Sequence, residues 1–530
     1  MSHGGPTETM TAKTKSPIAN DASATDGVLG TGVPYHAPLF IGGVWTEAAA
    51  GRTLDVLNPA TGAVIGTLAA AGAGDVGGAV ASAQAAFESG VWRDLSIHQR
   101  ARVLNRFADL FEADLESLFR LETLNNGRPI AETRAQVGRL PQFYRYFAAL
   151  ALTRRSDVIP IEGDFLCYTQ RVPLGVAALL TSFNHPLMIL SKSLAPALAT
   201  GNSVVIKPSE QTPFTTVRLV ELLARAGVPA GVVNLVNGAG AEAGAALAAN
   251  PDVRKVVFTG GTEVGRSIAG AAARNFAAAT LELGGKGAAI VFEDIELERA
   301  VNGAAFAAFV AAGQTCICGS RILVQRSRYR EFLEAFGRKA AAIRVGDPGE
   351  PETQLGPVIS ERSRRRILEM LERARAGGAK VLTGGGIPPD APSAGYYLEP
   401  TVLYDVEPSC EIAQDEVFGP VTVVMPFDDE QDALRIANGT RFGLAASVWT
   451  NDVARAHRVA RQLIFGMVWV NDHHRLDPAS PWGGFKDSGV GRETGVESFD
   501  QFTESRAVTV NTTGRTIDWY GSDGAPKRLN

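Results

Sequence analysis

Hydrophobic and polar positions follow different periods in different parts of the chain. Between residues 74 and 127, apolar residues recur every three to four positions, which predicts successive amphipathic helices. Asp75 is placed to cap the first of these helices, and Asn126-Gly127 to end the last. Before them, the segment 39–45 (LFIGGVW) predicts a short strand closed by a Gly-Gly turn. Ordered structure is therefore expected to begin near residue 39.

From residue 164 onward, short apolar runs replace the helical pattern. The segment 164–180 predicts strands interrupted at Pro173-Leu174-Gly175, and a helical pattern occupies 213–227. Further buried strands are predicted at 203–207, 232–236, 255–258 and 287–292. Buried strands that alternate with helices indicate βαβ units and a parallel sheet.

A second α/β region is predicted from about residue 294 to 490. It begins with a helix over 294–313, for which Asp294 is the expected N-cap, with acidic residues in the first turn. The last strand-like run, 503–512, stands alone, and an isolated strand is not stable in water. We therefore expect it to pair with another element, which another subunit could supply.

Length and composition narrow the class of protein. A chain of 530 residues is too long for one core, and 45% hydrophobic with 20% charged residues is ordinary for a globular α/β protein. A net charge of −5 without a basic cluster argues against nucleic acid as a partner. The sequence contains no apolar run of about 18 residues, so it predicts no membrane-spanning helix.

The N-terminus and the cysteine count bear on the compartment. About 35 polar residues at the N-terminus contain no apolar stretch of the kind a signal peptide needs, and we expect them to be disordered. Four cysteines do not make a disulfide framework. A protein of the reducing cytoplasm is expected.

Two glycine-rich segments are candidates for binding a dinucleotide. The segment 238–244 (GAGAEAG) approaches G-x-G-x-x-G, but its glycine spacing is one residue too long. The segment 259–265 (TGGTEVG) follows a predicted strand and leads into a predicted helix over 266–276, which suits a phosphate, although an ordinary βα turn has the same pattern. Lys207 and Glu210 follow another buried strand, at the edge where α/β folds bind ligands.

The segment 313–319 (GQTCICG) contains Cys316 and Cys318. A zinc site is not indicated, because Cys167 and Cys410 lie far away in sequence and no histidine has ligand spacing. A disulfide across one residue would be strained. On these residues alone, Cys316 is either a nucleophile or a buried small hydrophobic residue.

Seven motifs that occur in order resemble those of the NAD(P)-dependent aldehyde dehydrogenase superfamily. They are 183-FNHP-186, 203-SVVIKPSEQTP-213, 258-FTGGTEVG-265, 281-LELGGK-286, 313-GQTCICGSR-321, 415-DEVFGPV-421 and 481-PWGGFKDSGVGRE-493. One such motif would be weak evidence, but seven collinear motifs make chance implausible. The resemblance extends from about residue 39 to 515.

The resemblance implies an aldehyde-dehydrogenase-like α/β fold with three parts. The implied division is a Rossmann-type NAD-binding domain at 37–151 and 174–284, a catalytic α/β domain at 285–490, and oligomerisation strands at 152–173 and 500–515, between a disordered tail at 1–36 and a C-terminal tail at 516–530. A small β module of this kind implies a homodimer or a homotetramer.

The resemblance also implies three catalytic residues. Cys316 corresponds to the nucleophile, which forms a thiohemiacetal with the aldehyde. Asn184 and the backbone N–H of Cys316 correspond to the donors that bind the oxyanion. Glu282 corresponds to the general base that activates water to hydrolyse the thioester, and burial should raise its pKa. No catalytic role is implied for Cys318. We expect it to be a packing residue or to take part in a transient disulfide or sulfenamide that shields Cys316 under oxidation.

The implied reaction is the oxidation of an aldehyde to a carboxylic acid with NAD. The alternatives are a CoA-acylating aldehyde dehydrogenase and a non-catalytic binding protein with the same fold. Lys207 and Glu210 correspond to residues that hold the adenosine ribose, and a carboxylate at 210 would repel the 2′-phosphate of NADP. The other positions implied to surround the cofactor are Gly260, Gly261, Gly265, Gly284, Glu416 at the nicotinamide ribose and Phe418 beside the nicotinamide ring.

The substrate region departs from the family pattern. Phe183 stands where tryptophan is usual, His185 where an aromatic residue often follows the catalytic asparagine, and Lys192 at a position that often lines the substrate tunnel. Arg475 adds a further positive charge, and Phe309 and Trp482 are expected to form hydrophobic walls. We predict an aromatic, medium-chain or semialdehyde substrate whose anionic group meets Lys192 or Arg475; the alternative is that Lys192 extends into solvent.

Overall fold

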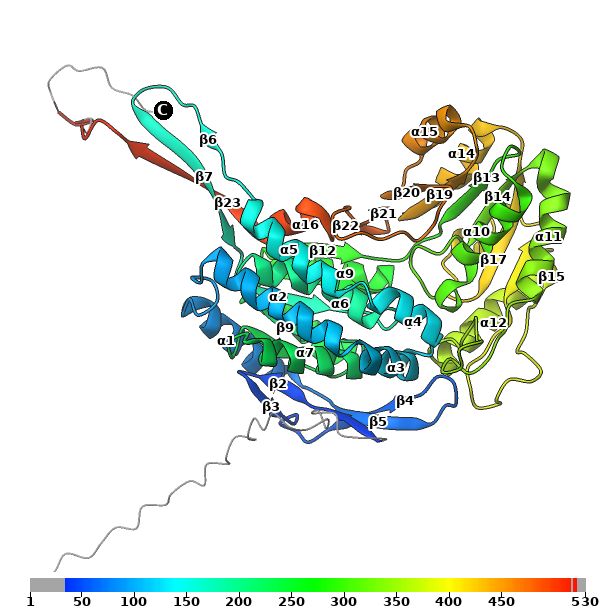
Figure 1. Cartoon of the computed structure of the whole chain (residues 1–530), viewed down its shortest axis with the longest axis horizontal. Helices are drawn as coiled ribbons and strands as arrows, with labels where there is room; N and C mark the ends of the chain where they lie inside the picture. The colour runs from blue at the N-terminus through cyan, green and yellow to red at the C-terminus, as the bar shows by residue number, and fades with distance from the viewer. Residues whose placement is uncertain (1–33, 516–517, 522–530) are drawn as a thin grey trace, which may run out of the picture.

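The computed structural model describes residues 34–515 and 518–521, which form an α/β body with a projecting arm (Figure 1). The predicted disordered tail lies outside the described residues up to residue 33. Its last residues instead begin a strand, β1 (Tyr35–Ala37). Of the predicted C-terminal tail, only residues 518–521 are described.

The first sheet has eight strands, and its five central strands are parallel. In order across the sheet they are β22 (Gly489–Val490), β12 (Ala278–Glu282), β11 (Val253–Thr259), β8 (Val176–Leu180), β9 (Ser203–Lys207), β10 (Val233–Leu235), β2 (Leu39–Ile41) and β3 (Val44–Thr46). The predicted strand at 203–207 and the Gly42-Gly43 turn between β2 and β3 are confirmed.

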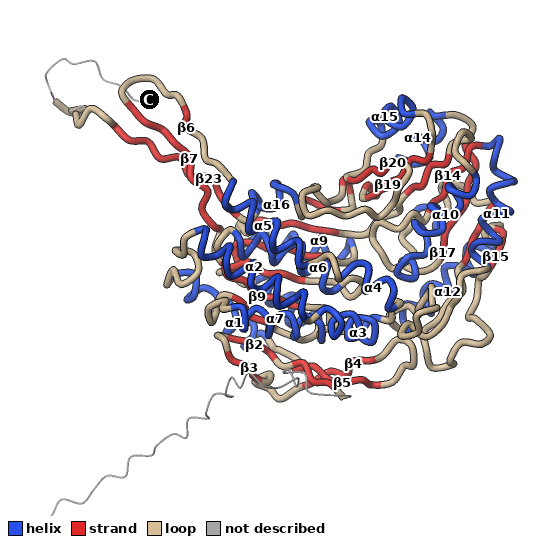
Figure 2. The backbone as a smooth tube through the Cα atoms, in the orientation of Figure 1, coloured by secondary structure: helices blue, strands red, loops and turns tan. Residues whose placement is uncertain are grey.

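Helices cover both faces of this sheet (Figures 1 and 2). One face carries α2 (Ile97–Ala113), α5 (Pro141–Thr153), α6 (Pro186–Ala199) and α7 (Phe214–Ala226), with α3 (Leu115–Asn126) and α4 (Ile130–Val137) beside them; the other carries α1 (Ala73–Glu88), α8 (Ala245–Ala249) and α9 (Thr262–Arg274). Alternate residues of β9 therefore enter two different cores, Val204 and Ile206 on one side and Val205 on the other. This two-sided burial explains the continuous apolar runs in the sequence.

Of three predicted helix boundaries, one agrees with the structure and two differ from it. Gly127, at φ 79°, ends α3 as predicted. Asp75 is not the N-cap of α1 but its third residue, and its carboxylate accepts the N–H of the N-cap residue Gly72 at 2.9 Å. Helix α9 begins at Thr262, four residues earlier than predicted, because the chain turns directly from β11 through Gly260-Gly261 into the helix.

The second sheet has seven strands and is parallel except at β15. In order they are β15 (Lys380–Thr383), β16 (Thr401–Tyr404), β17 (Val421–Phe427), β14 (Arg321–Gln325), β13 (Ala288–Val291), β19 (Ala445–Trp449) and β20 (Met467–Val470). Around it lie α10 (Leu297–Phe309), α11 (Tyr329–Ala341), α12 (Glu361–Ala376), α13 (Glu411–Gln414), α14 (Glu430–Asn438) and α15 (Val453–Gln462). The two sheets lie in the two halves of the body (Figure 1).

Asp294 does not cap the helix that follows it. Helix α10 begins at Leu297 with Glu296 as its N-cap residue. The Asp294 carboxylate instead accepts the hydroxyl of Thr450 and the backbone N–H groups of Asn451 and Asp452, each at 2.8–2.9 Å. Donors at the end of β19 therefore replace the helix N–H groups as its partners.

The arm is a three-stranded sheet that extends away from the body (Figures 1 and 2). Its strands are β6 (Val158–Ile159), β7 (Phe165–Pro173) and β23 (Thr503–Asn511). β23 pairs antiparallel with β7 along its whole length, from Thr503 opposite Pro173 to Asn511 opposite Phe165. The predicted strand at 503–512 is confirmed, and the strand that pairs with it, β7, belongs to the same chain.

The remaining elements are short. Strands β1, β5 (Val64–Ala69) and β4 (Thr53–Leu57) form a small sheet, β18 (Phe442–Gly443) pairs with β21 (Phe485–Lys486), and α16 (Gly495–Gln501) precedes the arm. Within the described part of the chain, every helix is too short or too polar to cross a bilayer.

Candidate active site

Cys316 lies in a tight loop between α10 and β14. Ala311 and Ala312 adopt left-handed backbone conformations, at φ 54° and 52°, and Gly313 follows at φ 66°. The Glu132 carboxylate accepts the N–H of Ala311 at 3.1 Å and holds this turn. A Cβ at Gly313 would lie 2.0 Å from the carbonyl oxygen of Gly419, so only glycine fits there. The loop thus presents Cys316, which is partly exposed, from a rigid backbone.

Asn184 is fixed beside this loop. It lies between β8 and α6, and its Nδ2 donates to the carbonyl oxygen of Gln314 at 2.9 Å. Its Oδ1 accepts the hydroxyl of Ser182 at 3.0 Å. Gln314 is itself held, because its Oε1 accepts the N–H of Ile359 at 2.9 Å. Since an amide nitrogen carries two hydrogens, Asn184 retains one for a further acceptor.

Glu282 ends β12, at the carboxyl edge of the first sheet. Its side chain is buried, and neither carboxylate oxygen has a hydrogen-bond partner among the described residues. Burial raises the pKa of Glu282 well above its usual range, and the charge of Glu493 raises it further, while Lys192 lowers it in part. This direction agrees with the raised pKa that was expected for a buried Glu282.

Lys192 and Glu493 form an ion pair, and each side chain is 2% exposed. The Lys192 Nζ also lies 4.6 Å from the centroid of the Trp482 ring. Burial by itself would lower the pKa of Lys192, but Glu493 and Glu282 outweigh it and raise that pKa, so the ammonium stays charged. The solvent-exposed alternative is wrong, and the charge expected to meet a substrate anion is already paired within the chain.

The surroundings of Cys316 favour the protonated thiol. Burial raises its pKa to about 12, although the Lys192 ammonium acts in the opposite direction. The same two charged residues, Lys192 and Glu282, thus influence Cys316 and each other. Cys318, two residues later, is buried, and its Sγ donates to the carbonyl oxygen of Ala308 at 3.3 Å, as expected of a packing residue.

The residues predicted to hold the adenosine ribose lie together at the end of β9. The Lys207 Nζ lies 3.1 Å from Glu210 Oε2, with Lys207 buried and Glu210 partly exposed. Burial would raise the pKa of Glu210, but Lys207 outweighs it, so the pKa is lowered. A charged carboxylate therefore stands at the surface end of this pair.

The glycines of the β11–α9 loop have different surroundings. A Cβ at Gly260 would lie 2.4 Å from the Phe258 ring, and one at Gly265 would lie 2.4 Å from the Leu283 side chain. Gly261, the N-cap residue of α9, has no atom within 4 Å of the position its Cβ would take. Two glycines thus allow close packing, and the third leaves open space at a helix N-terminus, as a phosphate requires.

Glu416 lies against the segment that follows Glu282. Its Oε1 accepts the N–H of Gly285 at 2.9 Å, and a Cβ at Gly284 would lie 2.4 Å from its Oε2. Burial raises the pKa of Glu416 to about 7. Glycine at 284 is therefore required by the close approach of this carboxylate.

Phe418 connects the cofactor positions to the catalytic ones. It has a left-handed backbone, at φ 52°, and its ring lies edge-on to that of Phe183, with 5.7 Å between centroids. Phe183 directly precedes Asn184. The structure therefore brings Glu416 and Phe418, which are assigned to the cofactor, next to the segments that carry Glu282 and Asn184.

Two of the predicted substrate residues lie elsewhere. Phe309 is 3% exposed and stacks on Phe336 in the core of the second sheet, so the wall expected of it is not formed. Phe306, one helical turn earlier, is 49% exposed and contacts His474, with 6.0 Å between ring centroids. The Arg475 side chain is 65% exposed and pairs with Asp472 at 3.1 Å, because both lie in the same turn.

Several residues of the site were not identified from the sequence as site residues. Glu493 could have been found, because it ends the motif 481–493. His474 directly precedes Arg475 but lies outside the seven motifs, and Phe306 does not stand out because α10 is rich in alanine. Trp482 and His185 are buried beside Lys192 and Asn184 respectively, which fits their predicted place near the substrate.

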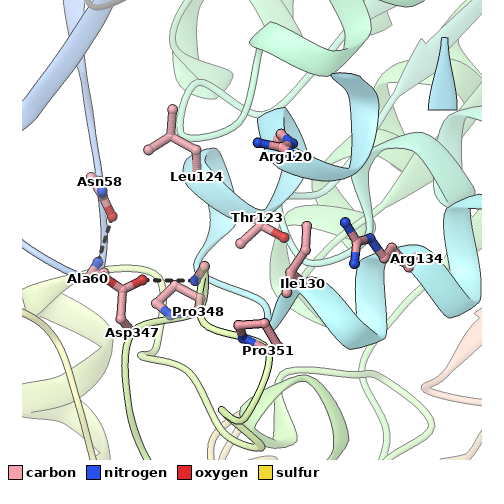
Figure 3. Close-up of a pocket in the computed structure, with 11 residues that line it drawn as sticks. Asn58, Ala60, Arg120, Thr123, Leu124, Ile130, Arg134, Asp347, Pro348 and Pro351 are labelled. Atoms are coloured by element: carbon pink, nitrogen blue, oxygen red, sulfur yellow. Dashed lines mark hydrogen bonds between the residues drawn. The ribbon is translucent and has the colours of Figure 1, made fainter. Parts of the chain in front are cut away.

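A cavity of about 370 Å³ lies apart from these residues (Figure 3). It is bounded by the β4–β5 turn, α3, α4 and the loop 347–351. Arg120 and Arg134, which face it, both bond to Glu116 Oε1, at 2.9 and 3.0 Å, so their charges are already paired. None of the residues predicted for catalysis or cofactor binding lines it.

Comparison with known proteins gives a consistent result. The sequence profile described as "Aldehyde dehydrogenase family" matches residues 45–508. The chain is 42% identical over 475 residues to a human mitochondrial aldehyde dehydrogenase, and the match covers 89% of this chain and 91% of that protein.

Solved structures agree with the sequence comparison. PnpE from Pseudomonas sp. WBC-3 is 45% identical, with a TM-score of 0.89, covering 92% of this chain and 99% of that chain. Betaine aldehyde dehydrogenase from Staphylococcus aureus, crystallised with NAD+, is 39% identical, with a TM-score of 0.90, covering 92% of this chain and 97% of that chain.

Proposed function

The chain belongs to the aldehyde dehydrogenase family, and on that premise we propose that Cys316, Asn184 and Glu282 carry out its reaction. It is an oxidoreductase that oxidises aldehydes with NAD. The observation that supports the assignment is the hydrogen bond from Asn184 Nδ2 to the carbonyl of Gln314, two residues before Cys316. Glu282 lies close enough to Cys316 for its charge to raise the pKa of the Cys316 thiol.

The first half of the reaction forms a covalent bond to the enzyme. Cys316 releases its proton to water, its sulfur bonds to the aldehyde carbon, and the carbonyl electrons move to oxygen. The second N–H of Asn184 and the backbone N–H of Cys316 stabilise this oxyanion. The Lys192 ammonium favours the thiolate. Bound NAD+ supplies the acceptor for the hydride that leaves the same carbon.

The second half releases the acid. When the oxyanion collapses, a thioester on Cys316 remains. Glu282 takes a proton from water, the water oxygen bonds to the thioester carbon, and the carbon–sulfur bond breaks to return the Cys316 sulfur. A base whose pKa is raised by burial is suited to this step near neutral pH.

The residues present fit NAD. Lys207 and Glu210 would hold the adenosine ribose, the open space at Gly261 would take the pyrophosphate, and Glu416 with Phe418 would face the nicotinamide riboside. An assay of NADH formation from benzaldehyde, hexanal and a dicarboxylate semialdehyde tests the function. Full rates without added CoA support hydrolysis, whereas a strict requirement for CoA contradicts it.

Replacing Glu210 with glutamine is expected to relax the choice of cofactor. The Glu210 charge would stand near the 2′-phosphate of NADP, and one like-charge contact of this kind costs about 1 kcal/mol in water, or roughly fivefold in binding. The ratio of kcat/KM for NADP to that for NAD should therefore rise at least about fivefold. Glu47→Gln, at an exposed position, is the control; an unchanged ratio in both variants would contradict the role of Glu210.

Replacing Glu493 with glutamine is expected to move the acid limb of the pH–kcat profile to lower pH. Glu282 must be unprotonated to act, and Glu493 raises its pKa, so removing that charge lowers the pKa. Lys192→Met should move the limb the other way, because Lys192 lowers the pKa of Glu282. Breaking the buried pair costs about 3–5 kcal/mol of stability, so profiles are measured well below the melting temperature. A shift in the same direction in both variants would contradict this coupling.

The arm supports the proposal of a homodimer or a homotetramer. Among the described residues, six apolar side chains of the arm are 39–70% exposed, namely Val158, Ile159, Ile161, Phe165, Leu166 and Val510. A three-stranded sheet with an exposed apolar surface is a natural site for a second copy. Light scattering on the purified chain gives the mass; a monomer would refute the proposal. We also propose a cytoplasmic location, since the four cysteines are free and Cys316 must remain a thiol.

A further inference from the structure

A polar cluster, three of whose five residues are buried, adjoins the catalytic residues without taking part in the mechanism. It consists of Glu122 in α3, Arg128 in the α3–α4 turn, Gln136 in α4, His185 at the start of α6 and His474 in the loop after β20. Arg128 Nη1 donates to Glu122 Oε1 at 3.1 Å and to Gln136 Oε1 at 2.9 Å. Polar groups buried beside a substrate site are either satisfied internally or available to a ligand.

The cluster determines which nitrogen of His185 carries the hydrogen. Arginine has only donors, so the Gln136 atom that faces Arg128 must be the oxygen. The same oxygen lies 2.9 Å from His185 Nδ1. Because an oxygen of this kind cannot donate, Nδ1 carries the hydrogen and Nε2 keeps its lone pair.

The second nitrogen is left as an acceptor. His185 Nε2 is buried and has no hydrogen-bond partner among the described residues. Burial, together with the nearby charge of Arg128, lowers the pKa of His185 well below its usual range, so the ring stays neutral. A buried acceptor without a partner costs free energy that a hydrogen-bond donor would recover.

This acceptor belongs to the surroundings of the nucleophile. His185 directly follows Asn184, and its ring lies 6.0 Å from that of His474. His474 Nε2 in turn lies 3.3 Å from the hydroxyl of Thr315, the residue before Cys316. On its other side, His474 contacts the partly exposed Phe306. His185 is therefore linked through His474 to both Thr315, beside the nucleophile, and the partly exposed Phe306.

We propose that His185 Nε2 accepts a hydrogen bond from a hydroxyl group of the substrate, so that the preferred substrates are hydroxyaldehydes. The inference rests on the proposed function, since it concerns the aldehyde held at Cys316. A carboxylate, a ketone or an ether has no hydrogen to give to this nitrogen. An ammonium group could donate, but Arg128 and Lys192 act on His185 as positive charges and would repel it.

The test compares aldehydes that differ in one hydroxyl. The 2-, 3- and 4-(hydroxymethyl)benzaldehydes are each paired with the ethylbenzaldehyde of the same substitution and with the methyl ether of the alcohol. Wild-type enzyme is expected to prefer the alcohol over both partners by about tenfold in kcat/KM for at least one ring position. In His185→Phe that ratio should fall to about one, and in His457→Phe, an exposed histidine, it should stay as in wild type.

Each outcome is decisive. Ratios near one at all three ring positions in wild type, or a preference that survives in His185→Phe, overturn the proposal. If His185→Phe does not fold, the wild-type comparison of alcohol with methyl ether decides, because equal rates show that no acceptor is used. If benzaldehyde, hexanal and the semialdehyde yield no NADH either, the proposed function fails and this inference with it. If those aldehydes are oxidised but the hydroxymethylbenzaldehydes are not, or are oxidised without any preference, the inference alone is overturned.

Discussion

Cys316→Ala is expected to reduce kcat for aldehyde oxidation by about 10⁴–10⁶-fold, which is the scale of loss when a covalent catalyst loses its nucleophile. Both bond-forming steps pass through the Cys316 sulfur, and alanine can form neither the thiohemiacetal nor the thioester. The measurement is NADH formation from the best aldehyde of the panel, with saturating NAD. Circular dichroism and NAD binding, measured in parallel, establish that the variant is folded.

Cys318→Ala is the matched control for this experiment. It removes a thiol two residues away, whose one hydrogen bond goes to the carbonyl oxygen of Ala308. Because that thiol packs in the core, kcat should stay within about threefold of wild type, with a small loss of stability of about 1 kcal/mol. If Cys318→Ala loses as much activity as Cys316→Ala, the packing role is wrong. If Cys316→Ala keeps its activity, the mechanism is wrong.

Glu282→Gln is expected to separate the two halves of the reaction. Hydride transfer precedes the step that uses Glu282, so one NADH per active site should still form rapidly. Steady-state turnover should then fall by about 10²–10⁴-fold, because glutamine cannot take the proton from water. A stopped-flow record of NADH absorbance shows both the initial burst and the slow rate that follows. The substitution keeps the size of the side chain and removes a buried charge-bearing group, so the fold is preserved.

The control for this variant is Glu263→Gln, an exposed glutamate at the start of α9, which should behave as wild type. Two results would contradict the assigned role. Unchanged turnover would mean that another group activates water. Loss of the burst together with the turnover would mean that Glu282 is needed earlier, to deprotonate Cys316.

The core of the fold could be read from the sequence because its pattern is a consequence of burial. Strands β8, β9 and β11 are covered by helices on both faces, so each contains a continuous apolar run, at 176–180, 204–206 and 256–258 respectively. Gly127 was identifiable for a different reason, since a left-handed residue at a helix end favours glycine. Both signals are local in sequence.

Boundaries that depend on distant residues could not be predicted in this way. Asp294 has the right place and chemistry for a helix cap, but its partners are Thr450, Asn451 and Asp452, more than 150 residues later. The same holds for Lys192, whose charge is paired by Glu493, 301 residues away. No local pattern reports whether a buried cation already has its counter-ion.

The two phenylalanines of α10 show a finer limit. Phe306 and Phe309 are three residues apart, and on a helix such residues lie on nearly the same side. The rest of α10 is mostly small residues, so its apolar pattern does not define which side faces the core. One ring is buried against Phe336 and the other contacts His474. Only packing against the second sheet separates them.

The position of β22 has a consequence for how the protein is made. This short strand pairs with β12 at Leu281 and Glu282, yet it is encoded roughly 200 residues later. At about 5–20 residues per second, the ribosome needs about 10–40 s to synthesise the intervening chain. During that time β12 is an uncovered sheet edge, and β7 of the arm waits longer still for β23. The nascent chain thus has two unpaired strand edges, which can pair with other chains, until synthesis is almost complete. A ribosome that stalls before residue 489 leaves a fragment in which both edges are exposed.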